Sequence, residues 1–410
     1  MAAEIRTRPQ TRRPVLVSKL EGCNGTVTKA IIIPKEDGVI SVSEDRTVRV
    51  WLKRDSGLYW PSICHSMQAS CSTMEFNPET RRLFVGLDNG IISEFSISED
   101  YNSLKTRREY LAHQSRVTDV FFSVLTELVL SLGRDKFFQW HCSETGRRLG
   151  GYKLEAWGTA LQFDEETKHA FVADYSGQIT VLKVMDNGHQ VITSLKGHSV
   201  PFLFFHLDKG STRCLAWDTE NKLLFSGSFD QSIIVWDIGG QKGTAFELQG
   251  HTGKVESVCY SARSKQLFSA GDDNNIVVWN MAGKRQETPE WEESDTCQKC
   301  SSPFFWNFKE MWTSKTLGVR QHHCRKCGHA LCDKCTPERS TLPTLGFEFE
   351  VRICKDCADS LTDADRAPMA SFYDSKHAIV SMYLDDVKGQ LVTCGTDKVI
   401  KLWDVSTLIQ

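Results

Sequence analysis

Eight cysteines between Cys297 and Cys357 have the spacing of metal ligands. They form four Cys-x2-Cys pairs, and 23, 4 and 18 residues separate the successive pairs. Eight thiolates suffice for two closed tetrahedral zinc sites, and a closed site leaves no position for a reactive water. The pattern therefore predicts two structural Zn2+ ions and no zinc-dependent hydrolysis. The expected ligands are Cys297, Cys300, Cys324, Cys327, Cys332, Cys335, Cys354 and Cys357.

The spacing alone leaves the pairing open, because four such pairs can ligate either sequentially or in a cross-brace. The other seven of the 15 cysteines are scattered singly along the chain. This distribution predicts metal thiolates and buried free thiols in a reducing compartment, and not a disulfide framework.

A basic segment surrounds the second cysteine pair. It reads Arg-Gln-His-His-Cys-Arg-Lys-Cys-Gly from Arg320 to Gly328, and no acidic residue lies between Met311 and Cys332. A phosphomonoester carries about −1.5 to −2 charges and offers oxygens that suit forked guanidinium donors. The segment therefore predicts a phosphate site. Two other interpretations are a solvated basic face and arginines that neutralise the zinc thiolates.

Together with Trp291 and the Arg-Ile-Cys sequence that begins at Arg352, this segment resembles the FYVE zinc finger. The resemblance implies recognition of phosphatidylinositol 3-phosphate and a cross-brace. In a cross-brace the first and third cysteine pairs hold one zinc ion, and the second and fourth pairs hold the other. The residues that match the family's 3-phosphate contacts are Arg320, His322, His323, Arg325 and Arg352.

The chain departs from the family pattern at two positions. Gln321 stands where the family usually has a second basic residue, so one charge-assisted contact is lost and a modest affinity is expected. The family's Trp-x-x-Asp motif is shifted by one residue here, from Trp291 to Asp295, and Asp295 is expected to meet the inositol hydroxyls. Leu317, Gly318 and Val319 match the loop that family members insert into the bilayer, but their apolar area is too small for stable anchoring alone.

A second pattern recurs along the chain with a period near 40 residues. In each copy a turn Asp precedes alternating apolar residues and then Trp, as in the segments that end at Trp51, Trp140, Trp236, Trp279 and Trp403. Two weaker copies end at Phe95 and near Leu182, which gives seven copies. Gly-His or X-His pairs precede several of them, at His113, His198, His251 and His377.

This period and alternation argue for a radial all-β repeat protein. The Gly-His and Trp-Asp signatures resemble the WD-repeat family and imply a seven-bladed β-propeller. The repeat Asp, His and Trp residues are then scaffold groups and not catalytic ones. The Asp residues assigned to scaffold turns are Asp45, Asp135, Asp230, Asp273 and Asp397.

The seventh repeat begins only after the cysteine-rich segment, which predicts an insertion. We expect repeats one to six at 14–285, the zinc finger at 286–362 between blades six and seven, and repeat seven at 366–406. Val15–Leu20 is expected to pair beside Val399–Trp403 and close the ring without an exposed edge.

Two apolar segments have no assigned place in the repeats. The stretch at 200–210 contains Pro201, Phe202, Leu203, Phe204 and Phe205, and it is expected to pack on its own blade, with a partner-binding wedge as the alternative. The long first spacer of the finger holds a denser aromatic group, which we expect to pack between finger and propeller, with entry into a membrane as the alternative. This group comprises Phe304, Phe305, Trp306, Phe308 and Trp312.

The combination resembles the small WD repeat and FYVE domain-containing proteins over the whole chain. It implies a non-enzymatic early-endosome adaptor that cycles between cytosol and membrane and whose propeller binds signalling kinases or trafficking proteins. A RING-type ubiquitin ligase is disfavoured, because RING domains normally have a Cys-His pair within the ligand series. Nucleic-acid binding is disfavoured by the net charge of −3 and by the small basic patch. No segment approaches the roughly 18 apolar residues of a membrane span.

Overall fold

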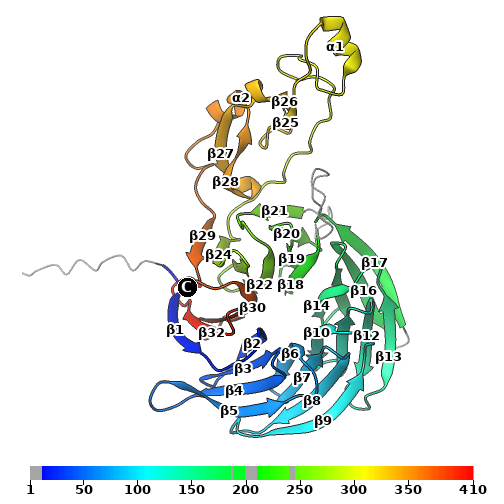
Figure 1. Ribbon diagram of the computed structural model, residues 1–410, viewed down its shortest axis with the longest axis vertical. Coiled ribbons are helices and arrows are strands. Elements are labelled where there is room, and N and C mark those ends of the chain that lie inside the picture. Colours follow the sequence, from blue (N-terminus) through cyan, green and yellow to red (C-terminus); the bar gives the residue numbers. More distant parts are fainter. Residues whose placement is uncertain (1–11, 186–187, 199–209, 240–244, 410) are drawn as a thin grey trace, which may run out of the picture.

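The larger part of the chain is a ring of radially arranged antiparallel sheets (Figure 1). The computed structural model describes residues 12–185, 188–198, 210–239 and 245–409. Within these residues the ring has seven blades, as the repeats predict, and each blade contains four strands. The apolar stretch around Phe202–Phe205 lies outside the described residues.

The first four blades follow the chain without interruption. In each blade the first strand is innermost and the fourth lies at the rim. They comprise β2 (Val27–Ile32), β3 (Gly38–Ser43), β4 (Thr47–Lys53) and β5 (Tyr59–Ser66); β6 (Cys71–Asn77), β7 (Arg82–Leu87), β8 (Ile91–Ile97) and β9 (Leu104–Leu111); β10 (Val117–Ser123), β11 (Leu128–Gly133), β12 (Phe137–Cys142) and β13 (Arg148–Lys153); and β14 (Gly158–Asp164), β15 (His169–Asp174), β16 (Gln178–Met185) and β17 (Gly188–Lys196).

The weak repeat copies near Phe95 and Leu182 form the third strands of the second and fourth blades, β8 and β16.

The remaining three blades complete the ring, and the finger is inserted in the sixth blade. Blades five to seven comprise β18 (Thr212–Asp218), β19 (Leu223–Ser228), β20 (Ser232–Asp237) and β21 (Ala245–Gln249); β22 (Val255–Ser261), β23 (Gln266–Gly271), β24 (Asn275–Asn280) and β29 (Ala370–Asp374); and β30 (Ile379–Asp385), β31 (Gln390–Gly395), β32 (Ile400–Asp404) and β1 (Val15–Leu20).

The N-terminal strand closes the ring. β1 pairs antiparallel with β32, and Leu20 lies opposite Ile400. The innermost strands β2 and β30 are in contact, so the first and last blades also meet at the centre. The expected closure is therefore confirmed. Because β1 covers the outer side of β32, the third strand of the last blade does not leave an exposed sheet edge.

The repeat signature residues form buried hydrogen-bond networks in the blades. In blade six, Nδ1 of His251 lies 2.8 Å from Asp273 and its Nε2 lies 2.7 Å from the hydroxyl of Ser269. The indole of Trp279 donates to the same hydroxyl at 2.8 Å. The hydrogen bond and the charge of His251 hold the pKa of Asp273 below its usual value, although burial opposes this. These groups are scaffold, as the repeat pattern predicts.

The turn Asp residues also have a local role. The residue after each of them has a positive φ, for example 62° at Asn274, and the Asp carboxylate accepts a backbone N–H two residues onward. An Asp side chain suits such a turn because it satisfies that N–H itself. The same arrangement recurs after Asp135, Asp230 and Asp397.

The finger is inserted between two strands of one sheet. The chain leaves blade six after β24 and returns as β29, so that Trp279 and Ala370 are cross-strand partners. The seventh sequence repeat thus begins with the rim strand of the sixth blade. The finger contains α1 (Phe308–Ser314), β25 (Gln321–His323), β26 (Ala330–Cys332), η1 (Asp333–Cys335), β27 (Glu338–Leu342), η2 (Pro343–Leu345), β28 (Phe347–Ile353) and α2 (Lys355–Asp359).

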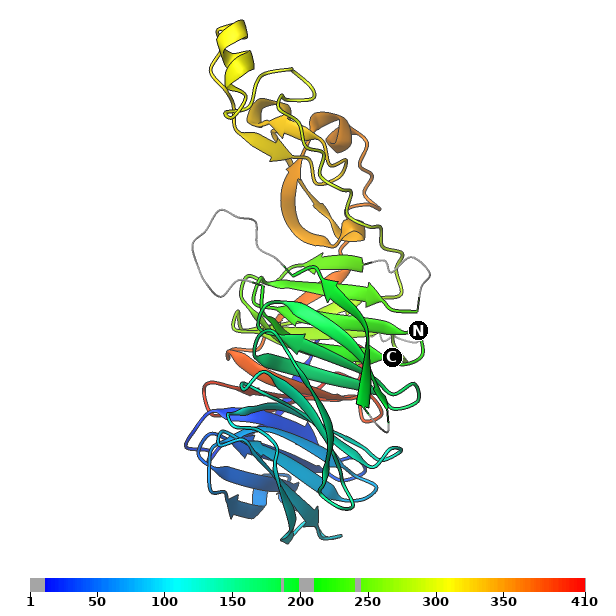
Figure 2. The same cartoon turned by 90° about the vertical axis from the view of Figure 1, so that its right-hand side faces the viewer.

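The base of the finger is fixed to the rim of blades five and six. Gln249 of β21 pairs in parallel with Phe347 of β28, and its N–H donates to the carbonyl of Gly346 at 2.8 Å. Gly346 has a φ of 88°, and a Cβ there would lie 1.8 Å from the carbonyl oxygen of Glu247, so only glycine fits. Arg285 donates to the carbonyl of Pro343 at 3.0 Å. The finger therefore projects outward from the rim (Figures 1 and 2).

The aromatic group of the first spacer does not pack against the propeller, so that expectation is wrong. Figures 1 and 2 show α1 at the end of the finger that is farthest from the ring. Phe304 is buried in the finger's own core, whereas the other four aromatic side chains are exposed. The α-helices in the described part of the chain are α1 and α2, and neither is long and apolar enough to span a membrane.

The hydrogen-bond network of blade six yields a stability prediction. The Asp273→Ala substitution leaves the buried ring nitrogen of His251 and the N–H of Thr252 without their acceptor. We expect a loss of about 1–3 kcal/mol in the free energy of unfolding, the usual cost of an unsatisfied buried group. Urea unfolding followed by tryptophan fluorescence measures it. The exposed Asp55→Ala is the matched control, and equal stability of the two variants would contradict the scaffold role.

Candidate functional site

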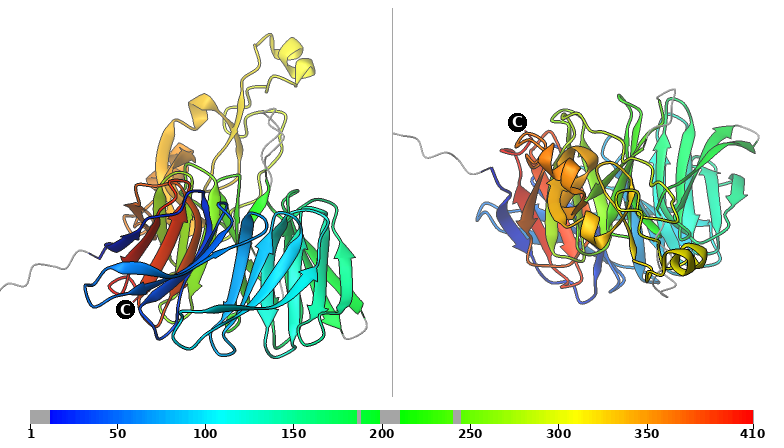
Figure 3. Two further views of the ribbon diagram at one scale, coloured as in Figure 1. Left: turned by 60° about the horizontal axis from the view of Figure 1, so that its bottom comes forward. Right: turned by 90° about the horizontal axis from the view of Figure 1, so that it is seen from above.

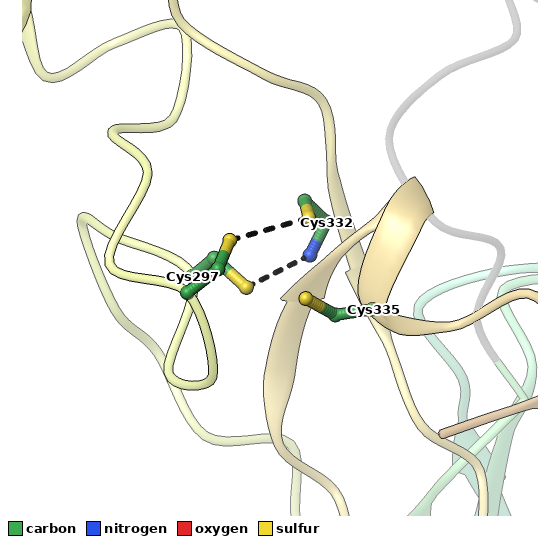
Figure 4. A group of neighbouring side chains, drawn as sticks. Cys297, Cys332 and Cys335 are labelled. Carbon is green, nitrogen blue, oxygen red and sulfur yellow. Dashed lines mark hydrogen bonds between the residues drawn. The ribbon is translucent and has the colours of Figure 1, made fainter. Parts of the chain in front are cut away.

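The eight clustered cysteines lie in two groups of four. Within each group the sulfur atoms all lie within 4.8 Å of one another. The pairing is the cross-brace that the resemblance implies: Cys297, Cys300, Cys332 and Cys335 in one group, and Cys324, Cys327, Cys354 and Cys357 in the other. Figure 4 shows how the first group joins the loop at Cys297 to β26 and η1.

Both groups fit structural zinc ions. The backbone N–H of Cys332 donates to the sulfur of Cys297 at 3.3 Å, and the N–H of Cys354 donates to Cys324 at the same distance. Such N–H groups stabilise thiolates. Burial and the neighbouring sulfur atoms of Cys354 and Cys324 raise the pKa of Cys357, because negative charge accumulates there. A divalent cation offsets this repulsion. With four sulfur ligands each, the sites are closed and structural.

The small apolar core of the finger is built around these sites. Phe304, Leu331, Phe347 and Ile353 are buried together with the cysteines. A core of this size contributes too little by itself to fix a fold, and small domains of this kind depend on a metal. The zinc sites therefore determine where β25, β26 and β28 lie, and with them the basic residues.

Basic residues from separate parts of the finger converge beside the second zinc group. Arg320 directly precedes β25 and His322 lies within it, Arg325 lies in the Cys324–Cys327 turn, and Arg352 lies near the end of β28. The N–H of Arg325 donates to the carbonyl of Arg352 at 3.0 Å. Burial lowers the pKa of His322, and the positive charges of Arg352 and Arg320 lower it further. The arrangement is a cluster of like charges, which has an affinity for anions.

One acidic residue lies within this cluster. The carboxylate of Asp333 accepts a hydrogen bond from Arg352 at 2.5 Å and lies 3.8 Å from Nε2 of His322. Arg352 holds the pKa of Asp333 below its usual value. Asp333 thus contacts Arg352 and lies near His322, two of the donors that were predicted to bind a phosphate. Sequence reasoning missed this residue, although its place directly after Cys332 is a signal that could have drawn attention to it.

The two adjacent histidines do not share one environment. Successive side chains of a strand point to opposite faces, and His322 faces Asp333 while His323 stacks on Trp291 with ring centroids 4.9 Å apart. Nε2 of His323 lies 3.1 Å from the carbonyl of Glu292 and is therefore its donor. Arg325 also lies over the Trp291 ring, 4.3 Å from its centroid. Trp291 thus orients both His323 and Arg325.

Asp295 lies apart from the cation cluster. Its carboxylate accepts a hydrogen bond from the indole of Trp306 at 3.0 Å, and its carbonyl accepts the N–H of Phe304. In this structure Asp295 supports the aromatic spacer. Its contact with inositol hydroxyls stays a prediction.

The predicted insertion loop is only partly available at the surface. Leu317 is 92% exposed, but Gly318 is buried and Val319 packs against the finger core. A Cβ at Gly318 would lie 2.7 Å from the sulfur of Met311. Of the three residues, Leu317 alone can enter a bilayer without rearrangement. The exposed apolar surface at this end comes instead from α1, which spacing alone did not predict.

Comparisons with known proteins agree with this architecture. The FYVE zinc finger family matches residues 288–363, and the WD domain, G-beta repeat family matches 14–51, 169–237, 243–280 and 368–404. The chain is 58% identical over 409 residues to mouse "WD repeat and FYVE domain-containing protein 2", with all of both chains covered. It is 54% identical to human "WD repeat and FYVE domain-containing protein 1", which covers all of this chain and 97% of that protein.

A more distant relative and a solved structure extend the comparison. The Caenorhabditis elegans "WD repeat and FYVE domain-containing protein 2" is 40% identical, with 97% of this chain and 94% of that protein covered. The crystal structure of the WD40 beta propeller domain of Doa1 has a TM-score of 0.62 at 15% identity, covering 96% of this chain and 97% of that one. The latter likeness concerns the fold alone.

The zinc sites yield a prediction about metal content. We expect native mass spectrometry to find two zinc ions in the full chain and one in the Cys297→Ala variant, because three remaining thiolates no longer close the first site. The Cys64→Ala variant, which changes an exposed propeller cysteine, should retain both ions. A Cys297→Ala protein with two zinc ions would contradict the assignment of Cys297 as a zinc ligand.

Proposed function

The chain belongs to the WD repeat and FYVE domain-containing protein family, and we propose that it is an adaptor for membranes that contain phosphatidylinositol 3-phosphate. In this proposal the finger binds the lipid headgroup, and the propeller presents surfaces to other proteins. The membrane is that of early endosomes, and the attachment is peripheral. The partners proposed for the propeller are signalling kinases or trafficking proteins.

The observation that carries the proposal is the convergence of Arg320, His322, Arg325 and Arg352 beside the second zinc group. Arg352 pairs with Asp333 and His322 lies 3.8 Å from the same carboxylate, whereas Arg320 and Arg325 form no ion pair with an acid of the described residues. Guanidinium groups suit a phosphomonoester because they are always charged and donate in a fork. The zinc thiolates hold these donors in place before the lipid arrives, which reduces the entropic cost of binding.

His323 has a supporting role in this proposal. As a neutral ring it already uses its single donor on the carbonyl of Glu292, and burial lowers the pKa of its imidazole. Its stacking on Trp291 fixes the wall against which Arg325 lies. We therefore assign direct phosphate contacts to Arg320, His322, Arg325 and Arg352, and positioning to His323.

The first functional prediction concerns the donors. The double variant Arg320→Ala, His322→Ala removes two of them without changing a zinc ligand. We expect vesicle affinity to fall by about tenfold or more, since each charge-assisted hydrogen bond contributes about 1.5–3 kcal/mol. Co-sedimentation with vesicles across the phosphoinositides measures the loss, and in cells the variant should be diffuse.

The matched control removes two exposed arginines from the propeller, Arg54→Ala and Arg263→Ala, and should bind as the wild type does. Equal binding of the wild type to all phosphoinositides would contradict a specific 3-phosphate site. Retained binding by the double variant would place the membrane contact elsewhere on the molecule.

The second functional prediction concerns Asp333, which competes with phosphate for Arg352 and His322. The Asp333→Asn substitution removes the competing charge. We expect vesicle affinity to rise by up to about fivefold, the scale of one exposed ion pair. Asp356→Asn is the matched control, because Asp356 is also an exposed acid of the finger and pairs with Lys299 outside the cluster. A fall in affinity would show that Asp333 positions Arg352 for the lipid.

A further inference from the structure

A groove of about 670 Å³ lies between the rims of blades six and seven. It is lined by residues of β24 and β29 from blade six and by residues of β1 and β32 from blade seven, on the side of the ring that the N-terminal strand closes (Figure 1). Three apolar side chains of its lining are exposed, Val15 by 53%, Leu16 by 39% and Phe372 by 46%. The volume lies within the roughly 300–1,000 Å³ of ligand pockets.

The lining of this groove is positively charged. It contains four cations and one acid, which are Arg13, Lys19, Lys376, Lys401 and Asp374. The carboxylate of Asp374 accepts the backbone N–H of Lys376 at 2.8 Å. Within the described residues none of the four cations forms an ion pair. We call this site the basic groove, and its charge attracts anions.

One of the four cations, Lys401, is buried. It is 5% exposed, and its ammonium group donates to the carbonyls of Ser375 at 2.9 Å and of Lys376 at 3.2 Å. Burial lowers the pKa of Lys401, and the charges of Lys19 and Lys376 lower it further. An ammonium group has three donors, so a third is left for a ligand. A buried charge without a counter-charge costs free energy, which a bound anion would offset.

The other blades show that the fold does not require this cation. Blades five and six have the buried apolar residues Ile234 and Val277 at the same position, two residues before the repeat Trp. Blade one has a cation there, Arg49, but Arg49 pairs with the turn acid Asp45 at 3.0 Å. Lys401 therefore combines the burial of the apolar residues with a charge that lacks the partner found in blade one.

The repeat His explains why blade seven lacks that pair. In blade seven the turn acid Asp397 lies 3.2 Å from Nδ1 of His377. In blade one Cys23 stands in place of the repeat His, and Asp45 contacts the cation instead. Blade seven thus has a repeat His and a buried cation but only one turn acid, and that acid contacts the His. Lys401 is left with backbone carbonyls.

We propose that the basic groove binds an extended acidic segment of a partner protein. A carboxylate or phosphate of the segment contacts Lys401, and apolar side chains beside it cover the exposed residues of the lining. This inference rests on the proposed protein-binding role of the propeller and gives that role a site and a ligand chemistry. It is independent of the lipid site in the finger.

The lining favours a protein segment over an inorganic anion or a bilayer. An inorganic anion would neutralise Lys401 but leave the exposed apolar side chains uncovered. A bilayer presents a flat surface, which does not reach a recessed ammonium group, and the groove lies on the ring, away from the distal end of the finger (Figures 1 and 3). A peptide supplies both kinds of contact, and a desolvated charge among apolar anchors is typical of the centre of a protein interface.

The test presents the full-length protein with libraries of short peptides. Their central residue is Glu, phosphoserine, Ser or Lys, and the flanking positions are degenerate. We expect the wild type to retain the Glu or the phosphoserine library at least about tenfold better than the Ser library, with apolar residues enriched beside the centre. The Glu and phosphoserine arms distinguish a carboxylate from a phosphate as the anion.

The decisive variant is Lys401→Met, which keeps an unbranched side chain and removes the charge. It should lose the preference for an acidic centre, and it should fold because blades five and six accept apolar residues at this position. The double variant Lys19→Ala, Lys376→Ala changes only exposed side chains of the lining and should weaken the same preference. Lys105→Met, at an exposed rim lysine of blade two, is the matched control and should select peptides as the wild type does.

The outcomes separate the inference from the proposed function. A wild type without preference for an acidic centre, or a Lys401→Met protein with an unchanged preference, overturns the basic groove. Peptides selected equally by both proteins would still uphold protein binding by the propeller at another surface. Co-sedimentation with vesicles containing phosphatidylinositol 3-phosphate should be unchanged in Lys401→Met, and its loss would assign the groove to lipid and overturn the inference. Absence of vesicle binding in the wild type overturns the lipid role alone.

Discussion

The arrangement of the propeller and the finger depends on one constraint. The chain leaves the sheet of blade six after β24 and must return to the same sheet as β29. β24 and β29 are neighbours in blade six, and the whole finger lies between Trp279 and its cross-strand partner Ala370. Since β29 is the rim strand, the finger must begin and end at the outer edge of the ring. Two contacts then fix its base: Gly346 accepts the N–H of Gln249 in β21, the rim strand of blade five, and Arg285, which follows β24, donates to the carbonyl of Pro343. The finger therefore extends away from the propeller and not over either face (Figures 1 and 2).

Within the finger, zinc and charge are coupled. The cross-brace requires strands from both ends of the insert to meet, and this brings Arg352 of β28 beside Arg325 of the second cysteine pair. The resulting like-charge cluster costs free energy in the absence of an anion, and one carboxylate, Asp333, offsets part of that cost. Under the proposed function, this acid stabilises the lipid-free finger and weakens lipid binding by the same interaction. The two effects have opposite signs and a common cause.

The sequence predicted what depends on strict local patterns and missed what depends on packing. Seven blades, the closing strand and the zinc ligands follow from spacing, and the structure agrees. The resemblance gives His322 and His323 the same expected phosphate contact, but strand alternation places them in different environments. Asp295 accepts a hydrogen bond from the indole of Trp306. Part of the aromatic spacer forms the exposed helix α1 and does not pack against the propeller. These outcomes depend on which face of a short strand or helix meets its neighbour. A segment of a few residues is too short for its hydrophobic periodicity to predict that face.

The radial attachment also bears on what an adaptor can do at a surface. If the distal end of the finger meets the bilayer, the ring stands on its edge, because the finger lies along a radius of the ring and not along its axis (Figures 1 and 3). Both circular faces of the propeller then remain clear of the lipid. A finger attached along the ring axis would instead have turned one face toward the lipid. Under the proposed function, the insertion point in blade six thus separates the lipid-binding surface of the finger from the protein-binding faces of the propeller, and a change in one need not alter the other.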